Sequence, residues 1–316
     1  MSNRPSIGGQ AVIEGVMMRN DEKYATAVRT QDKKIVLDKR EYKSFTKRFG
    51  ILNLPVVRGG VIFLESMVMG MKILTFSADF FEVEGEEEEP SKFDRFLEAK
   101  FGDKMNDIVI GIAVVLAMFL SIGLFFLLPA LISQLLGPIL PEGSRWMNLI
   151  DGLIRIIILL IYIITISKMK DIQRVFEYHG AEHKTINCYE SGDDITVENV
   201  LKHSRFHKRC GTNFIFIVVA VSIIILTIIG QESFWMRIGV RLLTLPLIAG
   251  VSYELLKIFG KYDNGFVSVF TAPGMALQRI TTSEPDAEQA EIAITSFLAV
   301  LNEDEWEVTV HETAED

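Results

Sequence analysis

Four long apolar segments constrain the fold of this chain more than any other feature of its sequence. A helix that crosses about 30 Å of hydrocarbon needs roughly 17 to 25 mostly apolar residues, because each residue advances it by about 1.5 Å. Within these segments, Ile156–Ile164 and Ile215–Ile229 are too uniformly apolar for the helices of a water-soluble core. We therefore predict four transmembrane helices, at residues 108–131, 149–167, 214–230 and 238–259.

The basic residues of the loops predict how these spans are oriented. The segment between the second and third spans is rich in Lys and Arg, whereas the short linkers on either side offer only Arg145 and Arg237. Basic residues are retained on the cytosolic side of a membrane. We therefore expect both termini and the middle segment to face the cytosol. The residues that favour this orientation are Lys100, Lys104, Lys168, Lys170, Arg174, Lys184, Lys202, Arg205, Lys208, Arg209, Lys257 and Lys261.

The predicted fold class is an α-helical polytopic membrane protein. It has four transmembrane helices, a small α+β cytosolic N-terminal region, and a cytosolic helical hairpin between spans two and three. The predicted regions are an N-terminal cytosolic region with a Gly-rich loop, a β-hairpin, an amphipathic helix and an acidic linker (1–106), a first transmembrane hairpin (107–167), a cytosolic His- and Cys-containing helical hairpin (168–212), a second transmembrane hairpin (213–260) and a cytosolic C-terminal region (261–316).

Three elements are expected in the soluble regions. Residues 24–30 and 34–42 alternate in strand fashion around a short turn, which predicts a β-hairpin. Residues 57–81 are apolar but interrupted by charged residues and a glycine. An amphipathic helix on the cytosolic membrane face or against the spans suits them better than a fifth crossing. Residues 286–300 follow a Ser-Glu-Pro sequence and predict a short helix.

Charge and cysteine content exclude several classes of protein. The net charge of −9 is concentrated in two acidic runs, 82–89 and 303–316, which are typical of a solvated linker and tail. No basic patch interleaved with aromatic residues appears, so we expect no nucleic-acid partner. The N-terminus lacks the apolar run of a secretory signal. Cys188 and Cys210 both lie in the segment predicted to be cytosolic, which favours reduced thiols or metal ligands over a disulfide.

Charged residues inside the predicted spans are functional candidates, because they are costly in hydrocarbon. Asp151 and Arg155 lie four residues apart in span two, where they can form a self-satisfied structural pair. Glu254 lies in the last turns of span four, near the cytosolic surface, and stays open as a functional candidate.

The middle segment concentrates the residues that carry chemistry. It holds both cysteines and four of the five histidines. A helix over 171–190, continuing from span two, would place His179 and His183 on one apolar face, and a second helix capped by Thr196 would do the same for His203 and His207. Folded about the turn at 191–194, the hairpin would bring four imidazoles together, with Glu182, Glu190 or Cys210 close by.

The first of these helices contains the sequence His-Gly-Ala-Glu-His, which begins at His179. It matches H-x-x-E-H, the pattern in which both histidines bind zinc and the Glu is the general base. A third ligand could be His207, Cys210 or Glu254, with His203 and Cys188 as further candidates; cysteine ligation favours zinc over magnesium or calcium. The alternative is a hairpin whose histidines are ordinary, partly exposed polar residues.

Four strings are spread over nearly the whole chain: Gly-Gly-Gln-Ala-Val-Ile-Glu-Gly-Val-Met-Met-Arg from Gly8, Tyr-His-Gly-Ala-Glu-His-Lys from Tyr178, His-Lys-Arg-Cys-Gly-Thr-Asn-Phe from His207, and Thr-Ala-Pro-Gly-Met-Ala-Leu-Gln from Thr271. Together they resemble the YqhQ family of bacterial membrane proteins, although Lys208 stands where the family often has Pro and His203 matches no signature position. The resemblance implies a metal-dependent enzyme in the bacterial cytoplasmic membrane, with His179, Glu182, His183, His207 and Cys210 in the signature.

Two hypotheses of function follow. The first is a membrane-embedded, zinc-dependent hydrolase at the cytosolic face, with Glu182 as the base. In it, a Gly-rich loop over 8–19 acts as a lid or substrate contact through Gly8, Gly9, Gln10 and Glu14. The second is a non-catalytic scaffold or membrane-protein biogenesis factor with a structural metal site. Solute transport is disfavoured because the spans contain few polar residues and no inverted repeat. The lipid bilayer is the partner that the sequence predicts, and no protein partner is indicated.

Overall fold

A computed structural model describes residues 7–20, 23–81, 105–136, 146–229, 234–262, 264–301 and 310–311. The acidic run at 82–89, the turn signals at 137–143 and nearly all of the acidic tail at 303–316 lie outside these residues, so the predictions made for them stay predictions.

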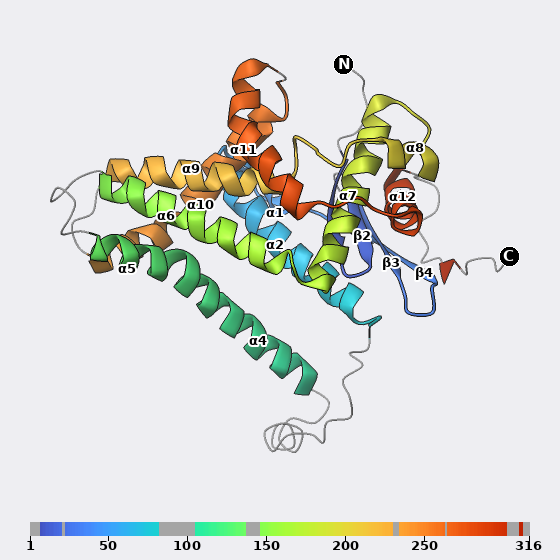
Figure 1. Cartoon of the computed structure of the whole chain (residues 1–316), viewed down its shortest axis with the longest axis horizontal. Helices are drawn as coiled ribbons and strands as arrows, with labels where there is room; N and C mark the ends of the chain where they lie inside the picture. The colour runs from blue at the N-terminus through green and yellow to red at the C-terminus, as the bar shows by residue number, and fades with distance from the viewer. Residues whose placement is uncertain are drawn as a thin grey trace. The chain divides into compact units, whose positions relative to one another are not determined.

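An antiparallel sheet forms the N-terminal part of the chain, with its strands in sequence order (Figure 1). The predicted hairpin is confirmed, since β3 and β4 pair in a register that places Arg29 opposite Ile35. The Gly-rich segment 8–19, predicted to be a loop, is instead a second hairpin that turns at Glu14, whose φ is +47°. Its glycines obscured the alternation of a strand pair. The strands are β1 Ile7–Val12, β2 Gly15–Asn20, β3 Lys23–Arg29, β4 Ile35–Glu41 and β5 Val310–His311.

Most of the described chain is helical. Two short helices, α1 Phe45–Arg48 and η1 Gly50–Asn53, follow the sheet. The longer elements are α2 Val57–Ala78, α4 Met105–Ile122, the π-helical turn η3 Gly123–Leu127, α5 Leu128–Leu135, α6 Trp146–Ile166, α7 Lys170–Ser191, α8 Val197–Lys202, α9 Gly211–Ile229, α10 Phe234–Phe259, α11 Gly265–Thr281 and α12 Ala287–Leu301.

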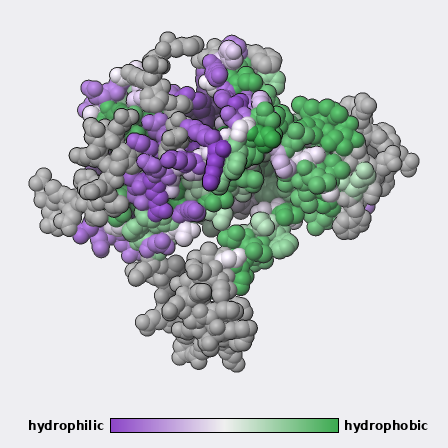
Figure 2. All heavy atoms as spheres, turned by 180° about the vertical axis from the view of Figure 1, so that it is seen from behind, coloured by the Kyte–Doolittle hydropathy of each residue, from purple (hydrophilic) through white to green (hydrophobic). Residues whose placement is uncertain are grey.

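Five helical stretches are long and apolar enough to cross a membrane. Four of them coincide with the predicted spans: the run α4–η3–α5, and helices α6, α9 and α10. The fifth is α2, for which we predicted a position along the membrane face or against the spans. Length and composition alone allow it to cross, so the number of crossings stays a prediction. Figure 2 shows that hydrophobic and hydrophilic side chains gather in separate areas of the surface.

The described chain forms two compact units, and the larger one combines parts that are distant in sequence. It comprises residues 1–81, 161–225 and 243–316, and thus contains the sheet together with α2, α7, α8, α11 and α12. The second unit comprises residues 82–160 and 226–242.

The sheet of the larger unit carries a hydrophobic core on each face. On one face, Val16 and Ala27 pack with Tyr178 of α7 and Phe297 of α12. On the other face, Val12, Met17 and Val28 pack with Met69 and Ile73 of α2. Side chains of a strand alternate between its two faces, and for this reason one short sheet can hold helices on both sides. The sheet is therefore the middle layer of three.

In the second unit, the predicted pairing of Asp151 with Arg155 is confirmed. Arg155 donates to the Asp151 carboxylate at 3.0 Å, and Arg241 donates to it at 2.6 Å from a side chain that is only 2% exposed. Ser133 contributes a hydroxyl 3.4 Å away. Because two guanidinium groups share one buried carboxylate, Asp151 connects three segments of this unit.

The middle segment differs from its prediction at both ends. Helix α7 does not continue from α6, because residues 167–169 interrupt the two. The turn at Gly192 and the Thr196 cap of α8 are confirmed. The second helix, however, ends at Lys202, and residues 203–210 are irregular rather than helical. His203 and His207 therefore do not share a helix face.

Helix α12 confirms the short C-terminal helix, and its first turn explains where it begins. The Asp286 side chain accepts a hydrogen bond from the backbone of Gln289, and the Gln289 side chain accepts one from the backbone of Asp286. This reciprocal capping box satisfies two amides that the helix itself leaves unpaired. Helix α11 was not predicted.

Replacing Phe297 by Ala tests the three-layer core. Phe297 is fully buried between the sheet and α7, so the cavity left behind should lower the free energy of unfolding by about 3–5 kcal/mol. The neighbouring Leu298 is 38% exposed, and Leu298→Ala should cost well under half as much. Thermal unfolding of the full chain in detergent measures both, and equal midpoints for the two variants would contradict this packing.

Candidate metal centre

Helix α7 carries the three residues of the H-x-x-E-H pattern at the centre of the larger unit. His179 and His183 are one helical turn apart, and their rings meet edge to face with centroids 4.4 Å apart. Cys210, just before α9, brings its Sγ to 3.3 Å from Nε2 of His179. Possible donor atoms of these three residues all lie within 4.8 Å of one another. The structure therefore assembles two imidazoles and one thiol from segments about 30 residues apart.

Backbone carbonyls fix the orientation of both rings. Nδ1 of His179 lies 2.8 Å from the carbonyl oxygen of Thr281, and Nδ1 of His183 lies 2.6 Å from that of Arg205. A carbonyl oxygen only accepts, so each Nδ1 carries the proton and each Nε2 keeps its lone pair. In metal sites, too, the ring nitrogen of a histidine that does not bind the ion commonly donates to a backbone carbonyl, which orients the ring.

Two of these histidines have surroundings that favour the neutral imidazole. Burial, together with the nearby His179 and His207 rings, lowers the pKa of His183 to about 2, while the Arg205 carbonyl opposes the shift. Burial also lowers the pKa of His207 to about 4. A neutral imidazole is the form that can donate a lone pair to a metal ion.

Burial acts in the opposite sense on the two acids of the site. It raises the pKa of the Glu182 carboxyl, against the opposing effects of His179 and of the Gly9 backbone amide. It also raises the pKa of the Cys210 thiol to about 11. Loss of hydration disfavours both anions. A divalent cation is a species whose charge would offset one carboxylate and one thiolate.

A cavity of about 440 Å³ adjoins these residues. His179, Glu182, His183 and Cys210 line one side of it, and the Gly8–Ala11 stretch of β1 lines another. Gly9 passes so close to Glu182 that a Cβ at this position would lie only 2.9 Å from the Glu182 Cδ. Strand β1 therefore needs glycine where it passes the buried carboxyl.

His207 also lines this cavity but lies outside the cluster of three donors. Its ring centroid is 5.7 Å from that of His183, and its Nε2 is 3.5 Å from Glu190. Gln278 of α11 holds its backbone in two places, accepting from the His207 amide at 2.9 Å and donating to the His207 carbonyl at 2.8 Å. No spacing or pattern in the sequence predicts this role for Gln278. It is only the last residue of the string from Thr271 that resembles the YqhQ family.

The remaining predicted ligands have other partners. His203 pairs with Asp193 at 2.9 Å. Cys188 is fully buried, and its thiol is 3.5 Å from the carbonyl of Asp194. Glu254 accepts two hydrogen bonds of 2.6 Å from Arg58. The four-imidazole arrangement expected from an antiparallel helical hairpin does not form, because the second helix ends before His203.

The residues expected to contact substrate fall into two groups. Gly8, Gly9 and Gln10 line the cavity. Glu14 does not line the cavity. Its carboxylate instead accepts hydrogen bonds from the Arg174 guanidinium and from the Tyr178 hydroxyl. It ties the first hairpin to α7, which positions β1 against the site.

Comparison with known proteins identifies the family. Residues 54–303 match a family described as a protein of unknown function, DUF1385. The chain belongs to this family. It is also 36% identical over 298 residues to the uncharacterised protein YqhQ of Bacillus subtilis strain 168. This alignment covers 94% of the chain and 92% of YqhQ. No solved structure matches the chain. The DUF1385 match and the identity to YqhQ together confirm the predicted family. Neither assigns an activity.

Substitution of Gly9 by Ala tests the contact between β1 and Glu182 in this DUF1385 protein. The added methyl would lie 2.6 Å from the Met17 carbonyl oxygen and 2.9 Å from Glu182, which forces a backbone shift. We expect the free energy of unfolding to fall by about 1–3 kcal/mol. Gly8→Ala is the matched control, since its methyl would meet nothing within 4 Å. Equal melting temperatures for both variants in detergent would contradict the close approach.

Proposed function

We propose that this protein is a membrane-embedded, zinc-dependent hydrolase acting at the cytosolic face of the bacterial cytoplasmic membrane. The observation that carries the proposal is the meeting of His179, His183 and Cys210 beside a cavity that the buried Glu182 also lines. In this proposal the run α4–η3–α5 and helices α6, α9 and α10 cross the bilayer. Both termini and the segment containing the site then face the cytosol.

The donor set fits zinc. Two nitrogens and one sulfur are ligands that Zn²⁺ accepts, whereas Mg²⁺ and Ca²⁺ prefer oxygen. Structural zinc sites use four protein ligands, and catalytic ones use three and keep an open position. Three donors within 4.8 Å of one another, next to a cavity, correspond to the second arrangement.

Each residue then has a distinct role. His179, His183 and Cys210 would hold the ion, which when bound supplies Lewis-acid chemistry. Glu182 is the candidate general base: it lines the same cavity, where its carboxylate can take a proton from an attacking water molecule and return it to the leaving group. Gly8, Gly9 and Gln10 form the wall against which a substrate would lie.

A structural metal site is the second candidate function, and one observation favours it. The donors come from α7 and from the segment before α9, and their orientation depends on the Thr281 and Arg205 carbonyls. An ion here would therefore join segments that are distant in sequence. In this case the protein is a scaffold or biogenesis factor, and Glu182 is a buried carboxyl with no catalytic role.

Metal content tests the shared premise of both candidates. We expect the full chain, purified in detergent, to contain about one zinc ion by elemental mass spectrometry. His183→Ala should lose it, with an affinity loss above the roughly 10- to 100-fold that removal of an outer-shell partner causes. His203→Ala is the control and should retain the ion, since His203 pairs with Asp193. Protein without stoichiometric metal in any form would exclude both candidates.

Glu182→Gln distinguishes the hydrolase from the scaffold. The amide keeps the shape of the side chain but cannot accept the proton, so a hydrolase should lose about 10²- to 10⁴-fold in rate while retaining its zinc. A chromosomal Glu182→Gln allele should then resemble a deletion of the gene. An allele that retains both zinc and full cellular function would favour the scaffold.

A further inference from the structure

A second cavity of about 440 Å³ lies beside the same edge strand. Gly8, Gly9 and Gln10 of β1 line both cavities, whereas the other walls differ. The metal centre uses α7, and the second cavity uses α2 and the loop that follows β4. Helices α7 and α2 pack on opposite faces of the sheet, so the two cavities flank β1 from different sides.

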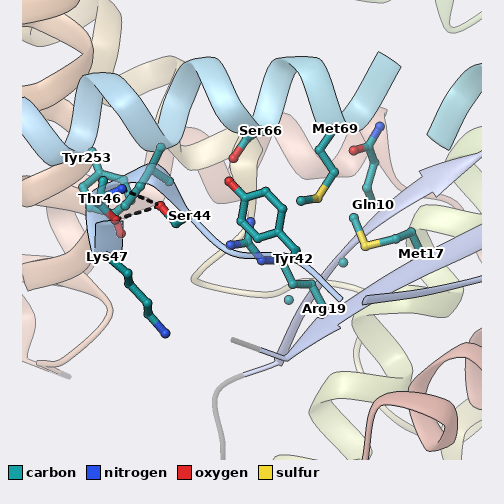
Figure 3. Close-up of a pocket in the computed structure, with 13 residues that line it drawn as sticks. Gln10, Met17, Arg19, Tyr42, Ser44, Thr46, Lys47, Ser66, Met69 and Tyr253 are labelled. Atoms are coloured by element: carbon teal, nitrogen blue, oxygen red, sulfur yellow. Dashed lines mark hydrogen bonds between the residues drawn. The ribbon is translucent and has the colours of Figure 1, made fainter. Parts of the chain in front are cut away.

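The second cavity has Ser44, Thr46 and Lys47 at one end, Met17 and Met69 at the other, and Arg19 between them (Figure 3). Arg19 stacks against the ring of Tyr42, with its guanidinium carbon 4.4 Å from the ring centroid (Figure 3). Met17 and Met69 form the apolar end beside Gln10. None of the described residues that line the cavity is acidic. The polar lining residues besides Arg19 and Gln10 are Tyr42, Ser44, Thr46, Lys47, Ser66 and Tyr253.

Glu65 of α2 contacts the cavity wall without itself lining the cavity. It accepts from the Ser44 hydroxyl at 2.8 Å and from the Phe45 amide at 2.6 Å. Burial and then Glu65 raise the pKa of Tyr42 to about 12. The guanidinium of Arg19 beside this phenol is a donor suited to an anion.

Residues 43–54, which include the short helices α1 and η1, border this cavity. This segment has the composition of a membrane-interface segment. It exposes Phe45, Phe49, Ile51 and Leu54, each more than half accessible. Lys43, Lys47 and Arg48 are interspersed with these apolar residues and are also exposed. Aromatic and aliphatic side chains alternating with basic ones favour the boundary between headgroups and acyl chains. Two of the apolar helices, α2 and α10, contribute Ser66 and Tyr253 to the cavity wall.

We propose that this cavity binds the phosphate-bearing headgroup of an anionic lipid. Arg19 holds the phosphate, and the Met17–Met69 end receives the first carbons of the lipid. The volume lies within the range of small-molecule sites, about 300–1,000 Å³. The site needs no metal ion, so it stands or falls independently of the hydrolase proposal.

Calorimetric titration of the full chain in detergent tests the proposal. The probes are dihexanoyl phosphatidic acid, dihexanoyl phosphatidylcholine and inorganic phosphate. We expect the anionic lipid to bind and the zwitterionic lipid to bind at least tenfold more weakly. Arg19→Gln should weaken binding of the anionic lipid about 10- to 100-fold, because it removes charge-assisted hydrogen bonds.

Arg48→Gln is the matched control, since Arg48 is exposed on the same loop but does not line the cavity. It should leave binding of the anionic lipid within about twofold of the wild-type value. Melting temperature and zinc content, measured on each variant, confirm that the fold and the metal centre are intact. Binding that survives in Arg19→Gln belongs elsewhere, the metal centre included, and overturns the proposal.

The inorganic phosphate titration separates the two sources of the anion. Weaker binding of phosphate than of the anionic lipid supports a headgroup site with an acyl-chain contact. Equal binding, lost in Arg19→Gln, assigns the cavity to free phosphate and overturns the lipid. Absence of binding by every probe, or equal losses in Arg19→Gln and Arg48→Gln, overturns the site altogether.

Discussion

The buried polar stretch of α7, residues 182–185, is the constraint on which the rest of the larger unit depends. Glu182, His183, Lys184 and Thr185 are all nearly inaccessible to water. A buried polar group without a partner costs about 1–3 kcal/mol, and an unpaired charge costs more. The surrounding chain must therefore bring hydrogen-bond partners to this helix, and it does so with backbone carbonyls.

Those partners explain why residues 203–206 are extended rather than helical. Lys184 donates to the carbonyls of Leu201 and His203 at 2.9 and 2.7 Å, and Asn187 donates to those of Ser204 and Phe206. A carbonyl that points at α7 is less available to a helix of its own. The C-terminal return passes equally close, since a Cβ at Gly180 would clash with the carbonyl oxygen of Ser283. The hydrogen bonds that satisfy α7 thus also orient His179 and His183.

Strand β1 links this helix to the rest of the protein. It contributes to the metal-centre cavity on one side and to the Arg19 cavity on the other. Glycines at positions 8 and 9 leave room for both, and the Glu14 turn fixes the strand by pairing with Arg174. A ligand in either cavity would contact the same short backbone segment. This shared strand gives the Gly-rich motif a physical reason that its sequence alone did not reveal.

The sequence determined the elements whose signal is local. Apolar length predicted the helices α6, α9, α10 and the α4–α5 run, alternation predicted the β3–β4 hairpin, and helical spacing placed His179, Glu182 and His183 together. Two segments were misassigned: the strand pair, whose glycines masked its alternation, and the run 203–210, whose helical spacing of apolar residues and histidines predicted a helix that does not form.

Only the tertiary structure decided which distant residues complete the site. Cys210 lies with His179 and His183. His207 lines the cavity, and its backbone is hydrogen-bonded to Gln278. His203 pairs with Asp193 instead. Spacing along a chain predicts which side chains share a face, but long-range hydrogen bonds decide where a helix ends. Here the backbone carbonyls after α8 accept hydrogen bonds from α7, and residues 203–210 are not helical although their spacing predicts a helix.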